Sequence, residues 1–321
     1  MEKGIVVLGS INYDIVSAVE KLPQKGETVH SYGFDTFTGG KGANQAVQIA
    51  LLGMRSVFIG QVGGDHQGEN VLEGIRAKGV DASFARVSPG ERTGCALITV
   101  APDGSNTLAH APGANHRIPK DLVDSAAALI GQAEMFITQN EINQDALLYG
   151  LTLAHEAGVK TLLNPAPAIP LPEELFAMLD YIAPNEVESE IYTKISRQGR
   201  SAEAWRRENA EWFLKQGVKN VCITLGAEGA YFFNGREERY VGAFPITAVD
   251  TTAAGDSFIG GFAFGIARGW PVEKSMILAN ACGALSSETR GAQNSIGNYE
   301  KIAAFLKERG ADPGQFSLPG V

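Results

Sequence analysis

The sequence is poor in cysteine and lacks long hydrophobic runs. The three cysteines, Cys95, Cys222 and Cys282, match no zinc-ligand spacing and cannot all pair, so we interpret them as free thiols in a reducing cytoplasm. No segment reaches about 18 consecutive apolar residues, so the sequence predicts no membrane-spanning helix. The apolar run 4–9 is too short for a signal peptide and indicates a first strand.

Positive charge is also scarce. The 321 residues include 27 Lys and Arg against 36 Asp and Glu, a formal net charge of −9. A basic stripe, the usual mark of a nucleic-acid partner, is absent. The overall field repels anions, so any anionic ligand must be held by local groups. The hydrophobic share of 44% is that of a folded globular protein rather than a disordered chain.

Several nucleotide-binding and hydrolytic motifs are missing. The Gly-Lys-Gly at 40–42 fails the Walker pattern, because Asp35 stands where the first glycine belongs and no hydroxyl follows Lys41. The G-x-G-x-x-G fingerprint occurs nowhere, which argues against a Rossmann dehydrogenase. G-x-S-x-G fails near Ser257, since Ile259 replaces the last glycine. H-E-x-x-H is absent as well.

What is present is an alternation of short apolar runs with amphipathic stretches. We expect strands at 5–8, 57–61, 135–139, 161–164, 181–183 and 221–225. We expect helices at 41–52, 68–78, 120–130, 144–157, 202–216, 255–268, 272–287 and 299–309. This βαβ rhythm predicts an α/β fold with a mostly parallel sheet, whose ligand sites lie at the carboxyl ends of the strands.

Two stretches break this rhythm. Residues 14–38 and 95–110 alternate apolar and polar positions around turn residues, which indicates antiparallel strands outside the main sheet. We predict that they form a small β lid on a single domain spanning 1–321. A further hairpin is expected at 229–241 around Asn234-Gly235, and 196–201 is expected to be an exposed loop.

The densest functional pattern is the segment 250–256, Asp-Thr-Thr-Ala-Ala-Gly-Asp. Small residues precede a helix here, so the amides of Ala253, Ala254 and Gly255 would lie at its positive N-terminus and could cradle a phosphate. Asp256 would repel that phosphate, unless it is the base for a hydroxyl that attacks it. The alternative is that Asp256 only caps the helix.

Other polar clusters follow the predicted strands. Asn12 and Asp14 come after the first strand and suit the neighbouring hydroxyls of a polyol, although a turn is an equal alternative. Asn185 and Glu188 could bind a hydrated Mg²⁺ beside phosphates; alternatively, they could cap a helix. The remaining candidates are Gly40, Lys41 and Asn44 at a second glycine-rich helix start, and Glu141 after the strand 135–139.

Together these clusters resemble the ribokinase-like (PfkB) family of carbohydrate kinases. The family's signatures appear in order at 9–14, 39–46, 164–168, 184–186, 224–226, 250–256 and 291–293, nearly the whole chain. The resemblance implies a three-layer α/β/α body with a β lid. It also implies transfer of the γ-phosphate of ATP to a sugar, with O5 of D-ribose as the expected acceptor.

Residue roles follow from the resemblance by position. Asp256 would be the catalytic base, beside an anion hole at Ala253, Ala254 and Gly255. The sugar would be held by Asn12, Asp14, Gly40, Lys41, Asn44 and Glu141. The ATP site would be lined by Asn185, Thr224, Gly226, Gly229, Gly255 and Asn280.

The resemblance further implies Mg²⁺, held indirectly by Glu188, and K⁺. The K⁺ loop would be formed by Asp250, Thr252, Ser286, Thr289, Gly291 and Ser295, largely through carbonyl oxygens. A cytoplasmic homodimer joined through the lid is expected, with neither nucleic acid nor membrane as partner.

The chain departs from the family pattern at Asn140, Thr289, Asn294, Gly297 and the segment 196–207. Asn140 stands before Glu141 where an apolar residue is usual, which bears on sugar identity, and the segment 196–207 is longer than usual. The alternatives are a kinase for deoxyribose, another small sugar or a nucleoside, and, from a different class, a non-catalytic sugar or nucleotide sensor. Loss of Asp256 or of the small-residue cradle would mark a sensor, and both are intact.

Overall fold

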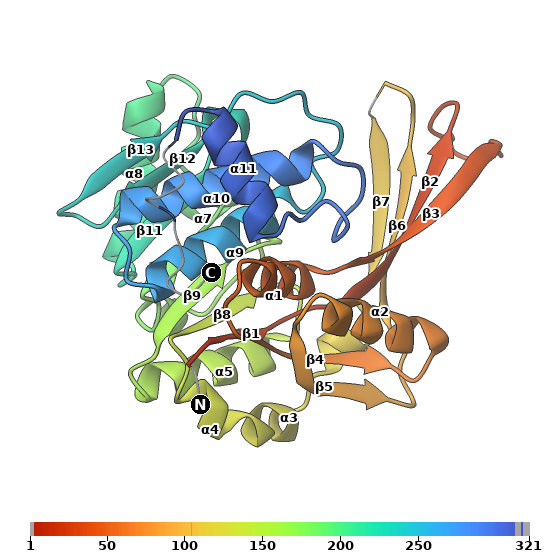
Figure 1. Cartoon of the computed structure of the whole chain (residues 1–321), viewed down its shortest axis with the longest axis horizontal. Coiled ribbons are helices and arrows are strands. Elements are labelled where there is room, and N and C mark those ends of the chain that lie inside the picture. Colours follow the sequence, from red (N-terminus) through yellow and green to blue (C-terminus); the bar gives the residue numbers. More distant parts are fainter. Residues whose placement is uncertain (1–2, 104, 312–315, 317–321) are drawn as a thin grey trace.

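The computed structural model describes residues 3–103, 105–311 and 316, which form two sheets (Figure 1). The larger sheet has nine strands within this part of the chain, in the order β13-β12-β11-β10-β9-β8-β1-β4-β5. Neighbouring strands from β5 to β11 in this order run parallel, and β12 and β13 are antiparallel additions. The prediction of a mostly parallel α/β sheet is therefore confirmed.

The strands of this sheet are short and largely buried. They are β1 (Ile5–Leu8), β4 (Ser56–Gly63), β5 (Asp81–Ser88), β8 (Met135–Gln139), β9 (Lys160–Asn164), β10 (Tyr181–Ile182), β11 (Asn220–Thr224), β12 (Ala230–Phe233) and β13 (Glu238–Val241). Every residue of β1, β4 and β8 is buried. Burial on both faces is why these strands are continuous apolar runs rather than alternating ones.

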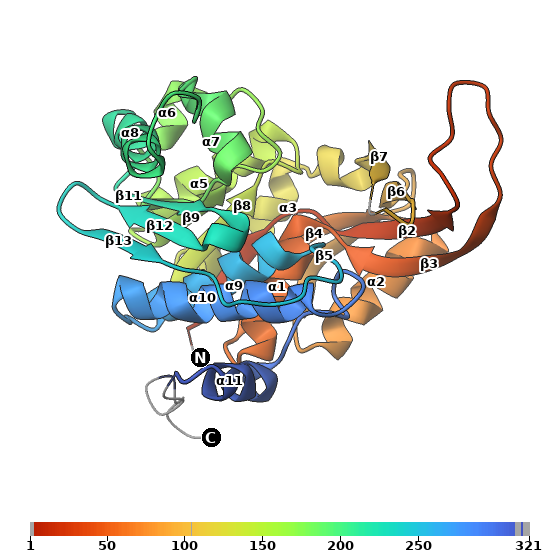
Figure 2. The ribbon, with the colours of Figure 1, turned by 90° about the horizontal axis from the view of Figure 1, so that it is seen from above.

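Helices cover both faces of this sheet (Figure 2). On one face lie α1 (Lys41–Leu51), α2 (His66–Ala77), α9 (Ala254–Ala267), α10 (Val272–Ser287) and, outside them, α11 (Tyr299–Glu308). On the other lie α3 (Lys120–Ser125), α4 (Ala127–Ile130), α5 (Gln144–Glu156), α6 (Glu173–Phe176), α7 (Glu186–Thr193) and α8 (Ala202–Lys215). None of the helices described is both long and apolar enough to cross a membrane.

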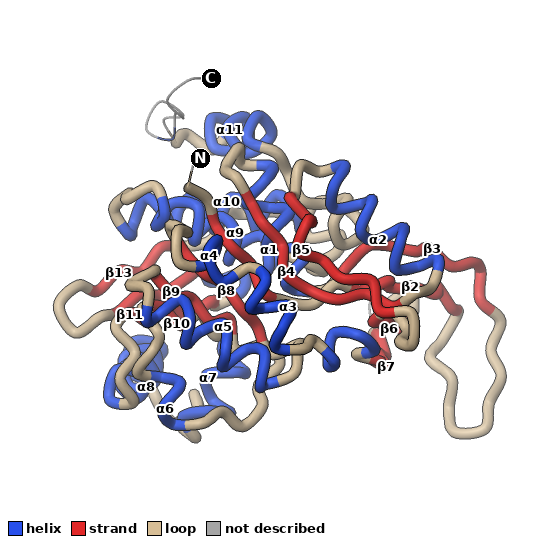
Figure 3. Tube along the Cα trace, turned by 90° about the horizontal axis from the view of Figure 1, so that it is seen from below, coloured by secondary structure: helices blue, strands red, loops and turns tan. Residues whose placement is uncertain are grey.

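The smaller sheet projects from one end of the body and has the order β3-β2-β6-β7 (Figure 3). Its strands are β2 (Asn12–Val19), β3 (Ser31–Gly39), β6 (Gly94–Val100) and β7 (Asn106–Ala111). We call this sheet the lid. The β2–β3 and β6–β7 pairs are antiparallel, whereas β2 and β6 pair in parallel, so the purely antiparallel prediction is corrected there.

Three other elements differ from prediction. The single helix expected at 120–130 is two, α3 and α4, interrupted at Ala126. Ser125 Oγ donates to the Leu122 carbonyl at 2.6 Å, a local bond that competes with helix continuation. The edge strand β5 was not predicted, because its half-exposed residues include the charged Asp81 and Arg86. The short helix α6 was also missed.

Candidate active site

The candidate residues come together where the parallel strands end. Ser10 follows β1, Glu141 follows β8 and Asn185 follows β10. Thr224 ends β11 and forms an isolated parallel bridge with Asn185. This edge is the position at which open α/β sheets bind ligands.

A cavity of about 640 Å³ lies between this edge, the lid and the start of α9. Its volume is that of a small-molecule site. It is lined by Asn12, Asp14, Gly40, Lys41, Asn44, Ala96, Ile98, Asn106, Leu108, His110, Glu141, Asn164, Ala166, Pro167, Ala183, Asn185, Glu188, Thr224, Thr251, Thr252, Ala253, Gly255, Asp256 and Ile259. Every residue that we expected to hold the sugar is in this set.

Asp256 lies in the first turn of α9 and is 8% exposed. Its Oδ2 accepts from Asn44 Nδ2 at 2.8 Å, and its Oδ1 accepts from Gln45 Nε2 at 3.2 Å. No described side chain caps α9, so the alternative role of Asp256 as a helix cap finds no support. Burial raises the pKa of Asp256 despite the nearby charge of Lys41. The carboxylate is thus oriented and made more basic, as a general base requires.

The turn before α9 exposes backbone donors to the cavity. Ala253 has φ 64°, a left-handed conformation that costs a non-glycine residue about 1–2 kcal/mol. The Ala254 amide donates to the Thr251 carbonyl at 3.1 Å, so it is engaged within the turn. The amides of Gly255 and Asp256 have no hydrogen-bond partner among the described residues. These two donors at a helix N-terminus suit an anion.

Lys41 is surrounded by negative charge. Burial alone would lower the pKa of Lys41, but nearby carboxylates outweigh it and the net shift is upward; these are Asp256, Glu141, Glu188 and Asp14. Lys41 therefore stays charged in the cavity. Four carboxylates around one ammonium give the cavity a net negative charge, like that of the chain as a whole. Uncharged backbone amide donors are therefore needed to hold a phosphate there.

Asp14 lies on β2 and is 8% exposed. Its Oδ1 is buried and has no hydrogen-bond partner among the described residues, and the residue lines the cavity. Burial, reinforced by the charge of Glu141, raises the pKa of Asp14 to about 7. A Cβ at Gly39 would lie 2.0 Å from Asp14 Oδ2, so only glycine leaves room for this carboxylate.

The glycine-rich turn before α1 packs against the end of β1. Gly40 has φ 88°, and a Cβ there would lie 2.7 Å from the Ile11 Cα. Glu141 fixes this turn, since its Oε2 accepts from the Lys41 amide at 3.1 Å and from Ser10 Oγ at 2.6 Å. The close packing brings Lys41 and Asn44 to the cavity and explains the glycines.

Asn185 and Glu188 form a capping box at the start of α7. The Glu188 amide donates to Asn185 Oδ1 at 2.8 Å, and Glu188 Oε2 accepts from the Asn185 amide at 2.9 Å. Helix capping, the alternative weighed from the sequence, is thus present, while both residues also line the cavity. Burial raises the pKa of Glu188.

Three predicted ATP-site residues lie outside the cavity lining. Gly226 begins the short 3₁₀ turn Gly226–Glu228 after β11. Gly229 has φ 108°, and a Cβ there would lie 2.1 Å from the Val241 carbonyl oxygen. Asn280, on α10, donates to the carbonyls of Val241 and Gly242 at 3.1 Å. Gly229 and Asn280 therefore shape the segment after β13.

The predicted cation loop joins two distant segments. Asp250 Oδ1 accepts from the Thr252 amide and Oδ2 from the Gly291 amide, both at 2.9 Å. Burial acts to raise the pKa of Asp250, but these hydrogen bonds outweigh it and lower the pKa, so the carboxylate stays charged. Ser286 and Ser295 are buried, and the Asp250 amide donates to the carbonyl of Ser287, the residue after Ser286, at 3.2 Å.

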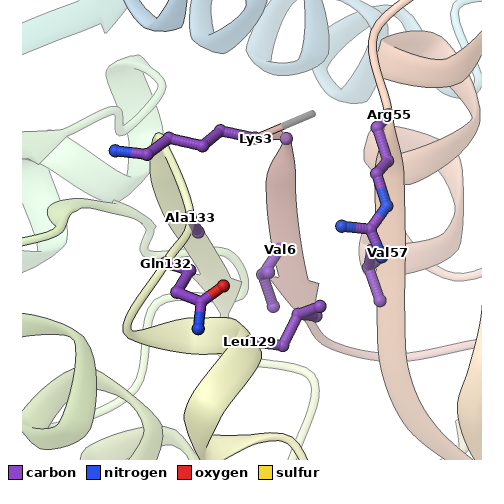
Figure 4. Close-up of a pocket in the computed structure, with 8 residues that line it drawn as sticks. Lys3, Val6, Arg55, Val57, Leu129, Gln132 and Ala133 are labelled. Carbon is purple, nitrogen blue, oxygen red and sulfur yellow. The ribbon is translucent and has the colours of Figure 1, made fainter. Parts of the chain in front are cut away.

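A second cavity lies at the opposite edge of the sheet, where β1, β4 and β8 begin (Figure 4). Lys3, Val6, Arg55, Val57 and Gln132 are among its lining residues. Its volume of about 30 Å³ holds one or two water molecules. It is too small for a sugar and far from the carboxyl ends of the strands.

Sequence reasoning missed several residues of the site. Asn164 lines the cavity. Gln45 does not line it but orients two residues that do, since its Nε2 donates to Asn164 Oδ1 at 3.1 Å and to Asp256 Oδ1 at 3.2 Å. His110 comes from a lid strand and carries no motif. Asn140, flagged as a departure from the family, does not line the cavity: its Nδ2 donates to the Pro167 carbonyl at 3.0 Å and to the Tyr192 hydroxyl at 2.9 Å.

Comparison with known proteins agrees with this geometry. Residues 2–298 match the family described as pfkB family carbohydrate kinase. A ribokinase of Staphylococcus aureus (strain COL) is 36% identical over 94% of this chain and 99% of its own. A deoxyribokinase of Salmonella typhi is 31% identical over 94% of this chain and 98% of its own. The structure of Arabidopsis thaliana ribokinase complexed with ribose and ATP superposes with a TM-score of 0.89 at 31% identity, covering 96% and 99%.

The fold and the site therefore define a phosphotransferase that acts on sugars. The chain belongs to the pfkB family of carbohydrate kinases.

Proposed function

We propose that this chain transfers the γ-phosphate of ATP to O5 of D-ribose, giving D-ribose 5-phosphate and ADP. The observation that carries the proposal is the position of Asp256, a buried carboxylate between the sugar-side residues and the free amides of α9. Similarity to ribokinases over nearly the whole chain supports ribose as the sugar.

In this proposal the sugar lies against β2 and the start of α1. Asn12, Asp14, Gly40, Lys41, Asn44 and Glu141 bind its hydroxyls. Asp256 takes the proton from O5 as that oxygen attacks phosphorus, and ADP leaves on the opposite side. The amides of Gly255 and Asp256 hold the transferring phosphoryl group. They follow Ala253 and Ala254, whose small side chains form the cradle. Catalysis rests on positioning and charge stabilisation.

ATP would extend from this cradle along the ends of β10 and β11, past Asn185 and Thr224 towards Gly226, Gly229 and Asn280. Glu188 fits Mg²⁺ through water, since both its carboxylate oxygens are already bonded to Asn185. The ion would neutralise phosphate charge. Within the described residues no group of three or more His, Cys, Asp or Glu side chains is placed to hold a metal ion.

Turnover assays with a panel of sugars test the proposal. ADP release from ATP should require a sugar and should be fastest with D-ribose among ribose, 2-deoxyribose, arabinose, xylose, fructose and nucleosides. A preference for 2-deoxyribose would favour the second candidate, a deoxyribokinase, which the relative from Salmonella typhi supports. Binding of sugar and ATP without any ADP release would favour a non-catalytic sensor.

We further propose a K⁺ site in the loop clamped by Asp250. Carbonyl oxygens of Asp250, Thr252, Ser286, Thr289, Gly291 and Ser295 would coordinate the ion; hard oxygen ligands suit an alkali cation. Because Asp250 bonds both halves of the loop beside the phosphate cradle, a bound ion would order the start of α9. We expect higher kcat in K⁺ than in Na⁺ or a bulky organic cation at equal ionic strength; equal rates in all three would remove this site.

We also propose that the lid joins two copies of the chain in the cytoplasm. Its exposed large apolar residues include Tyr32 (74% exposed), Phe34 (71%) and Leu97 (53%), whereas the exposed Leu108 lines the cavity. Leu97 alternates with the cavity-lining Ala96 and Ile98, so it faces away from the cavity and is free for a partner. Exposed apolar groups of this kind mark interaction surfaces.

Replacing Leu97 by Glu is expected to give a monomer, because the charge would be buried in the interface. Sedimentation at micromolar concentration measures this against a dimeric wild-type chain. Val187→Glu, at a position 66% exposed on α7, is the matched control and should leave the dimer intact. A monomeric wild-type chain would contradict the lid interface.

A further inference from the structure

His110 is a polar residue of the lid outside the set proposed to bind the sugar and ATP. It lies on β7 and lines the cavity beside residues that are apolar: Ala96, Ile98 and Leu108. Its ring Nε2 is 3.4 Å from Nδ2 of Asn12, a residue on the sugar side of the cavity. His110 is itself exposed. A ligand in the cavity can therefore reach it.

The direction of this contact is fixed by a buried neighbour. Asn115 is fully buried, and its Oδ1 accepts from the Ile11 amide at 3.0 Å. Its Nδ2 donates to the carbonyls of Ile11 at 3.2 Å and Pro112 at 3.1 Å. Backbone amides only donate and carbonyls only accept, so the side-chain amide of Asn115 has one possible orientation.

The orientation of Asn115 determines that of the Asn12 side chain, which in turn determines which atom His110 meets. Asn115 Nδ2 donates to Asn12 Oδ1 at 2.8 Å, so Asn12 must present Nδ2, a donor, to the ring of His110. Nε2 of the neutral ring is then an acceptor, and the ring proton lies on Nδ1. A donor and an acceptor thus stand next to each other at the sugar end of the cavity.

A sugar hydroxyl both donates and accepts, so it fits between these two groups. The 3.4 Å contact is longer than a usual hydrogen bond and is readily replaced. We propose that His110 is a specificity-determining residue: Nε2 accepts a hydrogen bond from the C2 or C3 hydroxyl of the bound pentose, and that hydroxyl accepts from Asn12 Nδ2. The inference rests on the proposed sugar kinase function.

Replacing His110 by Ala tests the contact. The KM for D-ribose should rise about 3- to 10-fold, the range of one neutral hydrogen bond, with kcat and the KM for ATP within about twofold. His110→Gln, which keeps an acceptor, should lie between Ala and wild type. His116→Ala is the control, because His116 is also exposed and does not line the cavity.

A comparison across sugars separates direct contact from a structural effect. The KM penalty of His110→Ala should vanish for the pentose that lacks or inverts the contacted hydroxyl, among 2-deoxyribose, arabinose and xylose, and persist for the others. An equal penalty for every sugar, or none for ribose, would overturn the assignment. If the wild-type chain phosphorylates no pentose, the proposed function fails as well; if it does and His110→Ala is unchanged, only the role of His110 fails.

Discussion

Asp256→Asn is expected to lower kcat by about 10²–10⁴, the usual effect of losing a general base. The amide cannot take the proton from the sugar hydroxyl, although it fills the same space between Asn44 and Gln45. Binding of ATP should stay near normal, since the Gly255 amide and the residues after β10 and β11 are unchanged. Single-turnover rates with saturating ribose and ATP measure the effect.

The loss should not reflect unfolding. Because burial raises the pKa of Asp256, replacing its carboxyl by a neutral amide should not reduce the thermal stability of the chain at neutral pH. Asp65→Asn is the matched control: Asp65 caps α2, away from the cavity, and this variant should keep wild-type kcat. An Asp256→Asn enzyme with more than a tenth of wild-type kcat would show that another group acts as the base.

Asp14→Asn should weaken sugar binding and stabilise the empty protein. The carboxylate lines the cavity and has one unpartnered oxygen, and losing one charged hydrogen bond to a sugar hydroxyl costs about 1.5–3 kcal/mol. The KM for ribose should therefore rise about 10- to 100-fold. The KM for ATP should not change, because Asp14 lies on β2, at the sugar side.

The effect on stability depends on pH in a defined direction. The pKa of Asp14 is about 7 in the folded chain against 3.8 without burial, so the folded state binds the proton more tightly. This group favours folding fully below pH 3.8, and its contribution is lost as the pH rises through 7. Asn does not titrate. The free energy of unfolding of Asp14→Asn relative to wild type should grow by about 2–3 kcal/mol between pH 5 and pH 8.

Urea unfolding of both proteins at the two pH values, without ligands, measures this change. Asp35→Asn serves as the control, since Asp35 is an exposed carboxylate on β3 and its replacement should have the same small effect at both values. If the difference between Asp14→Asn and wild type were equal at pH 5 and pH 8, Asp14 would not be the buried, raised-pKa group described.

The sequence predicted the body of the fold well because its strands are buried on both faces. The runs Ile5–Leu8 and Met135–Gln139 were predicted with their observed bounds. The pattern was weaker where an element is half exposed, as in β5, and where a side chain competes with the backbone, as Ser125 does between α3 and α4. The parallel pairing of β2 with β6 was missed, because alternation along a strand does not report its partner's direction.

For the site, the sequence identified the groups but not their partners. Short motifs identified Asp256 and Asn44 as separate candidates. Their 2.8 Å hydrogen bond could not be predicted in this way, because it joins residues 212 positions apart. His110 and Asn12 are 98 positions apart and meet because their strands, β7 and β2, both pair with β6 in the lid. The net charge of −9 suggested that anions need local donors, and the free amides of Gly255 and Asp256 are such donors.

The central claim is that this chain phosphorylates O5 of D-ribose with Asp256 as the base. The most direct measurement is phosphorus-31 NMR of the product formed from ATP and D-ribose by wild type and by Asp256→Asn. We predict one phosphomonoester coupled to the C5 protons, formed by wild type and nearly absent with the variant. A phosphate on C1, or ADP formed at the same rate without pentose, would contradict the account.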